Sequence, residues 1–435
     1  MVQMPPKQTT KTKLPVSLVR EAPPEAMAVP ARGFAKTFAA FKNINYRYFF
    51  MGQTVSLIGT WARSAAWGWL AYQWTHSKLL LGFIFMLNAL PIFLFSTYAG
   101  SLADRIPKLR IFKITSWTAM TASLAFSLLL FQGERDIRTL MGFVSLWGLC
   151  MAFEMPARQT LMVELVGKEN LVNAIALNSA MVNATRIIGP AIGGILLSAY
   201  GPQWCFLLDA ISFTAVLFGL YRMRIEKTTH VTGANTGWGY YSEGFRYVKN
   251  HPTLARTLSL MFLLSIGGWA YLSQFPAFVQ DRLGLGPDGY GWLLSMNGLG
   301  ACTAALLVAS QGNKLVKERT LFFGIALFSL FIFLFGFQHN PIGAAFLVFF
   351  AGFGIVLFFS TGNSLVQTYS PDPLRGRIMG IWALVFGGGM PLGSLWMGAV
   401  ASHFNNSGLA LQAGGVFCAL GAFFIYYFGL RKKGT

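Results

Sequence analysis

The chain has 435 residues, of which 54% are hydrophobic and 11% are charged, whereas soluble domains carry about 25% charged residues. This composition excludes an ordinary soluble protein and predicts a polypeptide that crosses a membrane many times. The net charge of +19 raises the question of nucleic-acid binding, but no zinc-finger spacing or recognition-helix pattern accompanies it. We therefore expect the partner of this protein to be a lipid bilayer and not a nucleic acid.

The N-terminal region differs in composition from the rest of the chain. Its first 33 residues are rich in Pro, Lys, Thr and Ala, which predicts a disordered tail. Residues 34–46 mix aromatic and basic side chains, and we expect them to lie along the membrane surface. Residues 1–45 are therefore assigned to a cytoplasmic tail with an interfacial segment.

Twelve apolar stretches follow, each close to or above the roughly 20 residues that a helix needs to cross a bilayer. They cover residues 47–73, 79–103, 108–131, 138–165, 174–200, 203–222, 254–280, 288–311, 319–338, 342–369, 375–403 and 408–430. The fold class expected is an all-α polytopic membrane protein with two six-helix bundles.

A polar segment divides the chain at residues 223–253. Its first part favours a flexible linker, and its second part has apolar and basic residues at helical spacing, which predicts an amphipathic helix. The bundles are then residues 46–222 and 254–430, with a cytoplasmic C-terminus at 431–435. The sequence SLIGTW at 56–61 resembles LSIGGW at 264–269, which supports two halves in parallel repeat.

The basic residues predict the orientation in the membrane. With the N-terminus inside, 28 of the 34 Lys and Arg residues fall in cytoplasmic segments or helix ends. Arg63 and Arg186 lie within spans, and the four that face outside are Lys78, Arg135, Arg138 and Arg282. This asymmetry follows the positive-inside rule and predicts that both termini are cytoplasmic.

The four cysteines and five histidines do not form a recognisable site. The cysteines are far apart in apolar runs, and the histidines do not cluster. Neither a metal-ligand spacing nor a catalytic Ser-His-Asp or H-E-x-x-H pattern is present. We expect no cofactor, no metal and no enzymatic activity.

The loop GSLADRIPKLR at 100–110 joins two predicted spans. By charge alone it fits an ordinary basic cytoplasmic loop. The order of its residues, however, resembles the loop between helices 2 and 3 of the major facilitator superfamily. This resemblance implies that Gly100 lets two helices approach closely and that Asp104 binds a cation. Arg158 is the expected partner of Asp104. The candidate gate residues are Gly100, Asp104, Arg105, Arg110, Arg158 and Arg377.

Four further stretches carry the same resemblance. They read FEMPARQTLMVELV at 153–166, GPAIGG at 189–194, EGFRYVKNHP at 243–252 and RGRIMG at 375–380. They are similar to the enterobactin-exporter-like branch of that superfamily, which also includes macrolide-efflux proteins. The resemblance implies a twelve-helix transporter of the bacterial cytoplasmic membrane that works by alternating access.

The glycine-rich stretch at 189–194 has two interpretations. A proline removes a backbone hydrogen bond from a helix, and glycines permit bending and close packing. The stretch is either a generic kinked helix or the hinge that resembles exporters of the superfamily. The residues concerned are Gly189, Pro190, Gly193 and Gly194.

Three charged residues are predicted to lie deep in the membrane. Arg63, Glu154 and Arg186 come to similar depths when residues are counted from the span ends, and a buried ion costs several kcal/mol unless it is paired. We expect them to share one site that binds an anion or exchanges a proton, the alternative being a fixed salt bridge. Asp209 either carries a proton or caps a neighbouring helix.

The second half supplies the other expected wall of the cavity. It offers amide and indole side chains, which suit an amphipathic substrate. The candidates are Gln274, Asn297, Trp269 and Trp382.

These features together favour a monomeric, proton-coupled exporter of an amphipathic or anionic small molecule, siderophore-like or drug-like. The alternatives are a lipid or lysophospholipid transporter of the same fold, and a membrane receptor that transports nothing.

Overall fold

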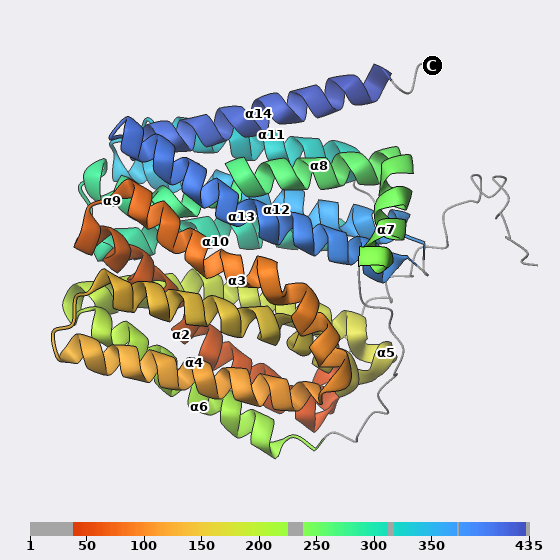
Figure 1. The fold of residues 1–435 in the computed structure, drawn as a ribbon, viewed down its shortest axis with the longest axis horizontal. Coiled ribbons are helices and arrows are strands. Elements are labelled where there is room, and N and C mark those ends of the chain that lie inside the picture. The colour runs from red at the N-terminus through yellow and green to blue at the C-terminus, as the bar shows by residue number, and fades with distance from the viewer. Residues whose placement is uncertain (1–37, 225–237, 312–316, 372–373, 432–435) are drawn as a thin grey trace, which may run out of the picture.

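The computed structural model describes residues 38–224, 238–311, 317–371 and 374–431. Within these ranges the regular elements are all helices, and most of them run side by side along the long axis of the molecule (Figure 1). The predictions for residues 1–37, for the linker at 225–237 and for the last four residues lie outside the described part of the chain.

The first half consists of the 3-10 helix η2 and five α-helices. Their bounds are η2 Ala39–Lys42, α2 Ile44–Thr75, α3 Lys78–Arg105, α4 Lys108–Phe131, α5 Ile137–Ala199 and α6 Pro202–Arg222. The 63-residue α5 contains two predicted spans, because its backbone leaves helical geometry at Gly167 (φ 69°, ψ 173°). A positive φ suits glycine, which has no Cβ to clash, so the chain reverses there and forms two spans, Ile137–Gly167 and Glu169–Ala199.

The second half contains seven α-helices and one 3-10 helix. Their bounds are α8 Pro252–Gly267, η3 Trp269–Gln274, α9 Phe275–Asp281, α10 Pro287–Gln311, α11 Lys317–Phe335, α12 Pro341–Tyr369, α13 Arg375–His403 and α14 Ser407–Arg431. The single helix predicted at 254–280 is therefore broken into α8, η3 and α9. The break follows the pair Gly267 and Gly268, and Pro276 lies in the first turn of α9, so residues that weaken or end helices account for it.

The helices begin at residues suited to that position. Ser77 accepts a hydrogen bond from the backbone of Leu80 at the start of α3, and Asn340 does the same for Ile342 at the start of α12. Such caps satisfy backbone N–H groups that have no partner within the helix. Pro202 and Pro252 occupy the first turns of α6 and α8, where a missing N–H costs nothing.

Eleven helical segments in the described ranges are long and apolar enough to cross a membrane. The remaining predicted span is α2, which is 32 residues long but carries polar side chains such as Gln53 and Arg63. It packs against α5 and α6, within the bundle of the first half. The chain is thus an all-helical, multi-pass membrane protein, as the sequence predicted.

The two halves lie against each other along two helix pairs, α5 with α10 and α3 with α13. Between the halves in sequence, α7 (Trp238–Asn250) lies across one end of the bundle, where α2 begins and α14 ends (Figure 1). We call this the terminal end. The helix predicted for the second part of residues 223–253 is therefore present, and an ion pair between Glu243 and Arg377 links it to α13.

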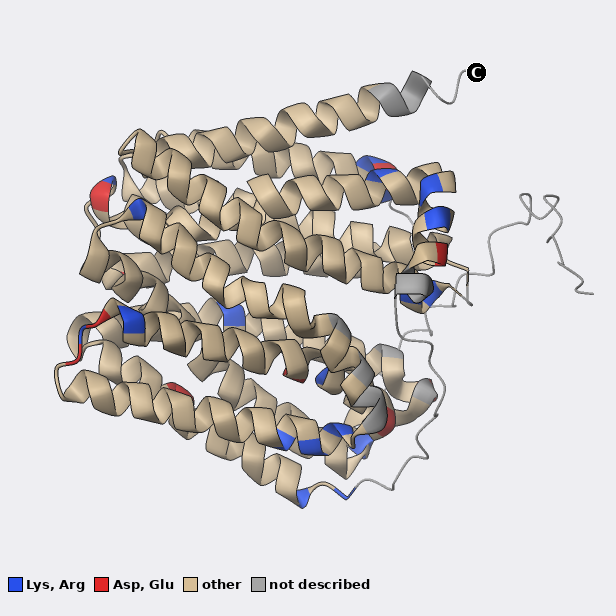
Figure 2. Ribbon diagram, in the orientation of Figure 1, with Lys and Arg blue, Asp and Glu red and all other residues tan. Residues whose placement is uncertain are grey.

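Charged residues are concentrated at the two ends of the helices, with few in the middle (Figure 2). Apolar packing fills the interior, for example where the rings of Phe275 and Phe278 lie 5.5 and 4.5 Å from that of Phe335. The few ionised groups between the ends need partners there, because no water in the bilayer core can solvate them.

Candidate functional site

A cavity of about 210 Å³ lies between the two halves. The first half contributes side chains of α2, α3 and α5, and the second half contributes η3, α10 and α13. The lining combines the indole rings of Trp61 and Trp269 with a few polar groups. The polar groups include Asn88, Arg186 and Asn297. This is the usual make-up of a site for a small amphipathic molecule.

Arg186 is the cation of this cavity. Its Nη2 donates a hydrogen bond to Oδ1 of Asn297 across the halves at 2.9 Å, and Nδ2 of Asn297 donates to the carbonyl of Val348 at 3.2 Å, which fixes the amide. The guanidinium carbon lies 5.9 Å from the ring centroids of both Trp61 and Trp269, within cation–π distance. In the part of the chain that the structure describes, no carboxylate forms an ion pair with Arg186.

The glycine-rich stretch of α5 packs beside this cavity. A Cβ added at Gly189 or Gly193 would clash with α2, at Trp61 and at Ala62 respectively, and one added at Gly194 would clash with the backbone carbonyl of Pro287 in α10. Only glycine permits backbones to approach so closely. The stretch therefore holds α5 against its neighbours on both sides, and its role as a hinge stays a prediction.

Arg63 and Asp209 form a second site, inside the first half. Nε of Arg63 lies 2.9 Å from Oδ2 of Asp209, and both side chains are fully buried. Asp209 also accepts hydrogen bonds from Ser123 at 2.5 Å and Thr60 at 3.2 Å. The guanidinium of Arg63 lies over the ring of Trp147 at 3.5 Å. Asp209 thus neutralises Arg63, a pairing that the sequence did not predict.

Glu154 has a different partner. Its Oε1 lies 3.8 Å from Nη1 of Arg158, one helical turn away, and Arg158 also donates to Oε1 of Gln53 at 3.4 Å. Glu154 is 6% exposed. Arg63, Glu154 and Arg186 thus contact three different partners, Asp209, Arg158 and Asn297, and among the described residues no hydrogen bond or ion pair joins the three to one another.

The remaining candidates for the cavity wall lie in different places. Trp269 lines the cavity. Gln274 is fully buried, and its Nε2 donates across the halves to the carbonyl of Lys78 at 3.2 Å. Trp382 packs within the second half, 5.6 Å from Phe359.

The candidate gate residues that the structure describes have different surroundings. An added Cβ at Gly100 would meet nothing within 4 Å among the described residues, so the close helix approach expected there is not seen in this part of the structure. Arg110 is exposed near the start of α4, and Arg377 pairs with Glu243. The side chains of Asp104 and Arg105 lie outside the described part, so the predicted pair of Asp104 with Arg158 stays a prediction.

A cluster at the end opposite α7 was missed by the sequence reasoning. Nζ of Lys78 lies 3.0 Å from Oδ2 of Asp281 and donates to Oδ1 of Asn405 at 2.9 Å, while the hydroxyl of Tyr72 donates to Oδ2 of Asp281 at 2.5 Å. These residues join α2 and α3 of the first half to the second half, and we call them the latch. The sequence shows that Lys78 and Asp281 are isolated charges at the ends of spans. It does not show that they pair, because the pairing depends on the tertiary fold.

Comparison with known proteins identifies the chain's relatives. The family model described as "transmembrane secretion effector" matches residues 35–435. The staphyloferrin A transporter of Staphylococcus aureus is 25% identical over 82% of this chain and 90% of its own length. A multidrug efflux pump of Mycolicibacterium fortuitum is 25% identical over 77% of this chain and 84% of its own length. The enterobactin exporter of Shigella boydii is 23% identical over 87% of this chain and 89% of its own length.

Solved structures share the fold at low identity. A bacterial homologue of the lysosomal transporter Spinster superposes with a TM-score of 0.71 at 12% identity, covering 92% of this chain and 98% of the other. A POT family transporter superposes with a TM-score of 0.73 at 13% identity, covering 89% of this chain and 96% of the other. The twelve predicted spans, the cavity between two halves and the match along almost the whole chain agree, and the protein therefore belongs to the transmembrane secretion effector family of major facilitator superfamily transporters.

Proposed function

We propose that this transporter exports an anionic, amphipathic small molecule across the bacterial cytoplasmic membrane by alternating access. The observation that carries the proposal is Arg186, a cation that faces a cavity between the halves and has no carboxylate partner among the described residues. A charge within the membrane is costly when it is unpaired, so an anion that binds Arg186 in this cavity forms an ion pair that lowers this cost. Related proteins named as a staphyloferrin A transporter and an enterobactin exporter support this class of substrate.

The cavity lining matches the two parts of such a molecule. Arg186 binds a carboxylate or catecholate oxygen by charge-assisted hydrogen bonds, while the amide of Asn297 orients the guanidinium. Trp61 and Trp269 contact the apolar or aromatic part. A drug-like anion fits the same description, and one relative is named a multidrug efflux pump.

The distribution of charge supports an orientation and a conformational state. Most Lys and Arg residues belong to segments at the terminal end, so the positive-inside rule places that end in the cytoplasm. In this orientation the latch closes the outer face, as expected of a form that receives its substrate from the cytoplasm. Substrate enters from the cytoplasm in this form and leaves after the latch opens.

We assign the coupling ion to the proton and its carrier to Glu154. Asp209 is held by Arg63, Thr60 and Ser123, so its charge is needed to neutralise Arg63. Among the described residues, Glu154 has Arg158 at 3.8 Å as its one ion-pair partner. Protonating Glu154 therefore breaks fewer contacts than protonating Asp209.

Calorimetric titration of the purified protein tests the substrate site. The probes are staphyloferrin A, enterobactin and an uncharged macrolide, and the variants are Arg186→Gln, Arg186→Lys and the exposed control Arg222→Gln. Loss of a charged hydrogen bond, worth about 1.5–3 kcal/mol, weakens anion binding by about 10- to 150-fold. We expect this loss in Arg186→Gln, a smaller loss in Arg186→Lys and none in the control. Equal anion affinity in wild type and Arg186→Gln would refute the assignment.

A further inference from the structure

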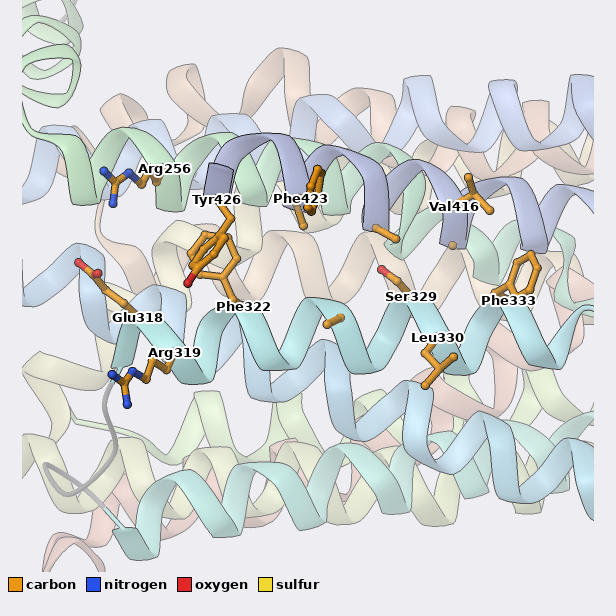
Figure 3. A pocket seen from close by; sticks show the side chains of 14 residues that line it. Arg256, Glu318, Arg319, Phe322, Ser329, Leu330, Phe333, Val416, Phe423 and Tyr426 are labelled. Atoms are coloured by element: carbon orange, nitrogen blue, oxygen red, sulfur yellow. The ribbon is translucent and has the colours of Figure 1, made fainter. Parts of the chain in front are cut away.

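A second and larger cavity, of about 900 Å³, lies within the second half and away from the interface between the halves. It runs between α11 and α14, with Arg256 of α8 at one end (Figure 3). We call it the α11–α14 groove. Its volume is at the upper end of the range of about 300–1,000 Å³ typical of ligand sites, yet the proposed transport path does not use it.

The groove has a polar end and an apolar end. Arg256, Glu318 and Arg319 stand together at the end where α11 begins, and Phe333 and Val416 lie at the other end (Figure 3). Glu318 accepts a hydrogen bond from Thr253 at 2.9 Å. Two guanidiniums and one carboxylate leave the polar end with a net positive charge.

Aromatic and aliphatic side chains form the walls between these ends. The rings of Phe322 and Tyr426 meet edge to face across the groove, 5.1 Å apart. Large apolar side chains remain open to the surroundings, with Leu330 53% exposed and Phe423 61% exposed. Because these helices cross the membrane, the surroundings at this depth are lipid chains and not water.

The length of the groove fits a lipid chain. Glu318 and Phe333 are 15 residues apart on α11, which is about 22 Å along a helix. One leaflet contributes about half of the roughly 30 Å hydrocarbon core. The groove is therefore long enough to cover acyl chains over the depth of one leaflet.

We propose that the α11–α14 groove is a binding site for an anionic phospholipid of the leaflet at the terminal end. The phosphodiester binds at the polar end through Arg256 and Arg319, whose guanidiniums suit phosphate oxygens and outnumber the carboxylate of Glu318, and the acyl chains pack on the apolar walls. The net positive charge selects an anionic headgroup over a zwitterionic one. This lipid stays with the protein, and the site is independent of the proposed substrate cavity.

Native mass spectrometry of the purified protein tests the site. The protein is equilibrated with equal amounts of phosphatidylglycerol and phosphatidylcholine that carry the same acyl chains, and the lipid adducts are counted. Wild type should retain phosphatidylglycerol preferentially. Each arginine near a charged lipid contributes binding that corresponds to about a fivefold change in affinity, so Arg256→Gln and Arg319→Gln should each lose about that factor.

Two further variants make the result specific to the groove. Ala326→Trp fills the groove without changing any charge and should also reduce the tightly held phosphatidylglycerol. Arg222→Gln removes a cation at the end of α6 in the first half and should leave it unchanged. Equal retention of the two lipids by wild type would overturn the proposal. So would arginine variants or an Ala326→Trp variant that retain as much phosphatidylglycerol as wild type.

Discussion

The latch offers the sharpest perturbation of the conformational equilibrium. In Asp281→Asn the side chain keeps its shape but loses its charge, so the contacts with Lys78 and the hydroxyl of Tyr72 weaken together. Lys78 keeps its hydrogen bond to Asn405, so part of the link between the halves remains. We expect the variant to populate the form that is open at the end opposite α7.

The magnitude follows from the exposure of the three side chains. Tyr72 and Lys78 are 2% and 7% exposed, whereas the side chain of Asp281 is 36% exposed. Hydrogen bonds to charged groups contribute about 1.5–3 kcal/mol when buried, and exposed ion pairs about 0–1 kcal/mol. An intermediate value of about 1–2 kcal/mol shifts the ratio of the two conformations by about 5- to 30-fold.

Electron–electron distance measurements in reconstituted protein provide the assay. Spin labels at positions 135 and 339 report on opposite halves at the latch end, in a background without the four native cysteines. Longer distances should gain population in Asp281→Asn, but not in Glu134→Gln, which removes a carboxylate at the same end within one half. Identical distance distributions in Asp281→Asn and wild type would refute the latch.

Three further predictions concern packing, charge burial and topology. Gly194→Val forces α5 away from α10 and should increase the population of longer distances between labels at positions 135 and 339. An unchanged distance distribution would show that this contact does not set the closed state. Asp209→Asn leaves Arg63 buried without an anion, which costs about 3–5 kcal/mol and should lower the thermal unfolding midpoint; an unaltered midpoint would contradict the pairing. Cysteines at positions 110 and 135 should react with an impermeant reagent from the cytoplasmic and the outer side respectively, and reversal of either would overturn the orientation.

The spans could be predicted because their signal is local. Apolar runs separated by short polar segments predicted the helices of the first half to within a few residues, for example 79–103 for Lys78–Arg105. The break between α8 and α9 was missed although Gly267, Gly268 and Pro276 are visible in the sequence. Weak helix residues are common in membrane spans, so their presence alone does not locate a break.

The pairing of charges could not be predicted from the sequence. Counting residues gives the depth of a side chain along its helix, but it does not give the direction in which the side chain points or the neighbouring helix. Arg63 and Glu154 have similar depths, yet Arg63 meets Asp209 of α6. Arg186 and Asn297 were each identified as candidates, but their contact depends on how α5 packs against α10.

The central claim is proton-driven export of an anion through the cavity, and pH-driven transport tests it most directly. In proteoliposomes with an imposed pH gradient, wild type should accumulate a labelled anionic siderophore against its concentration gradient. Glu154→Gln should lose this accumulation but keep exchange of labelled for unlabelled substrate, because exchange moves no net proton. Accumulation that ignores the pH gradient in wild type would contradict proton coupling, and full accumulation by Glu154→Gln would contradict the assignment of the carrier.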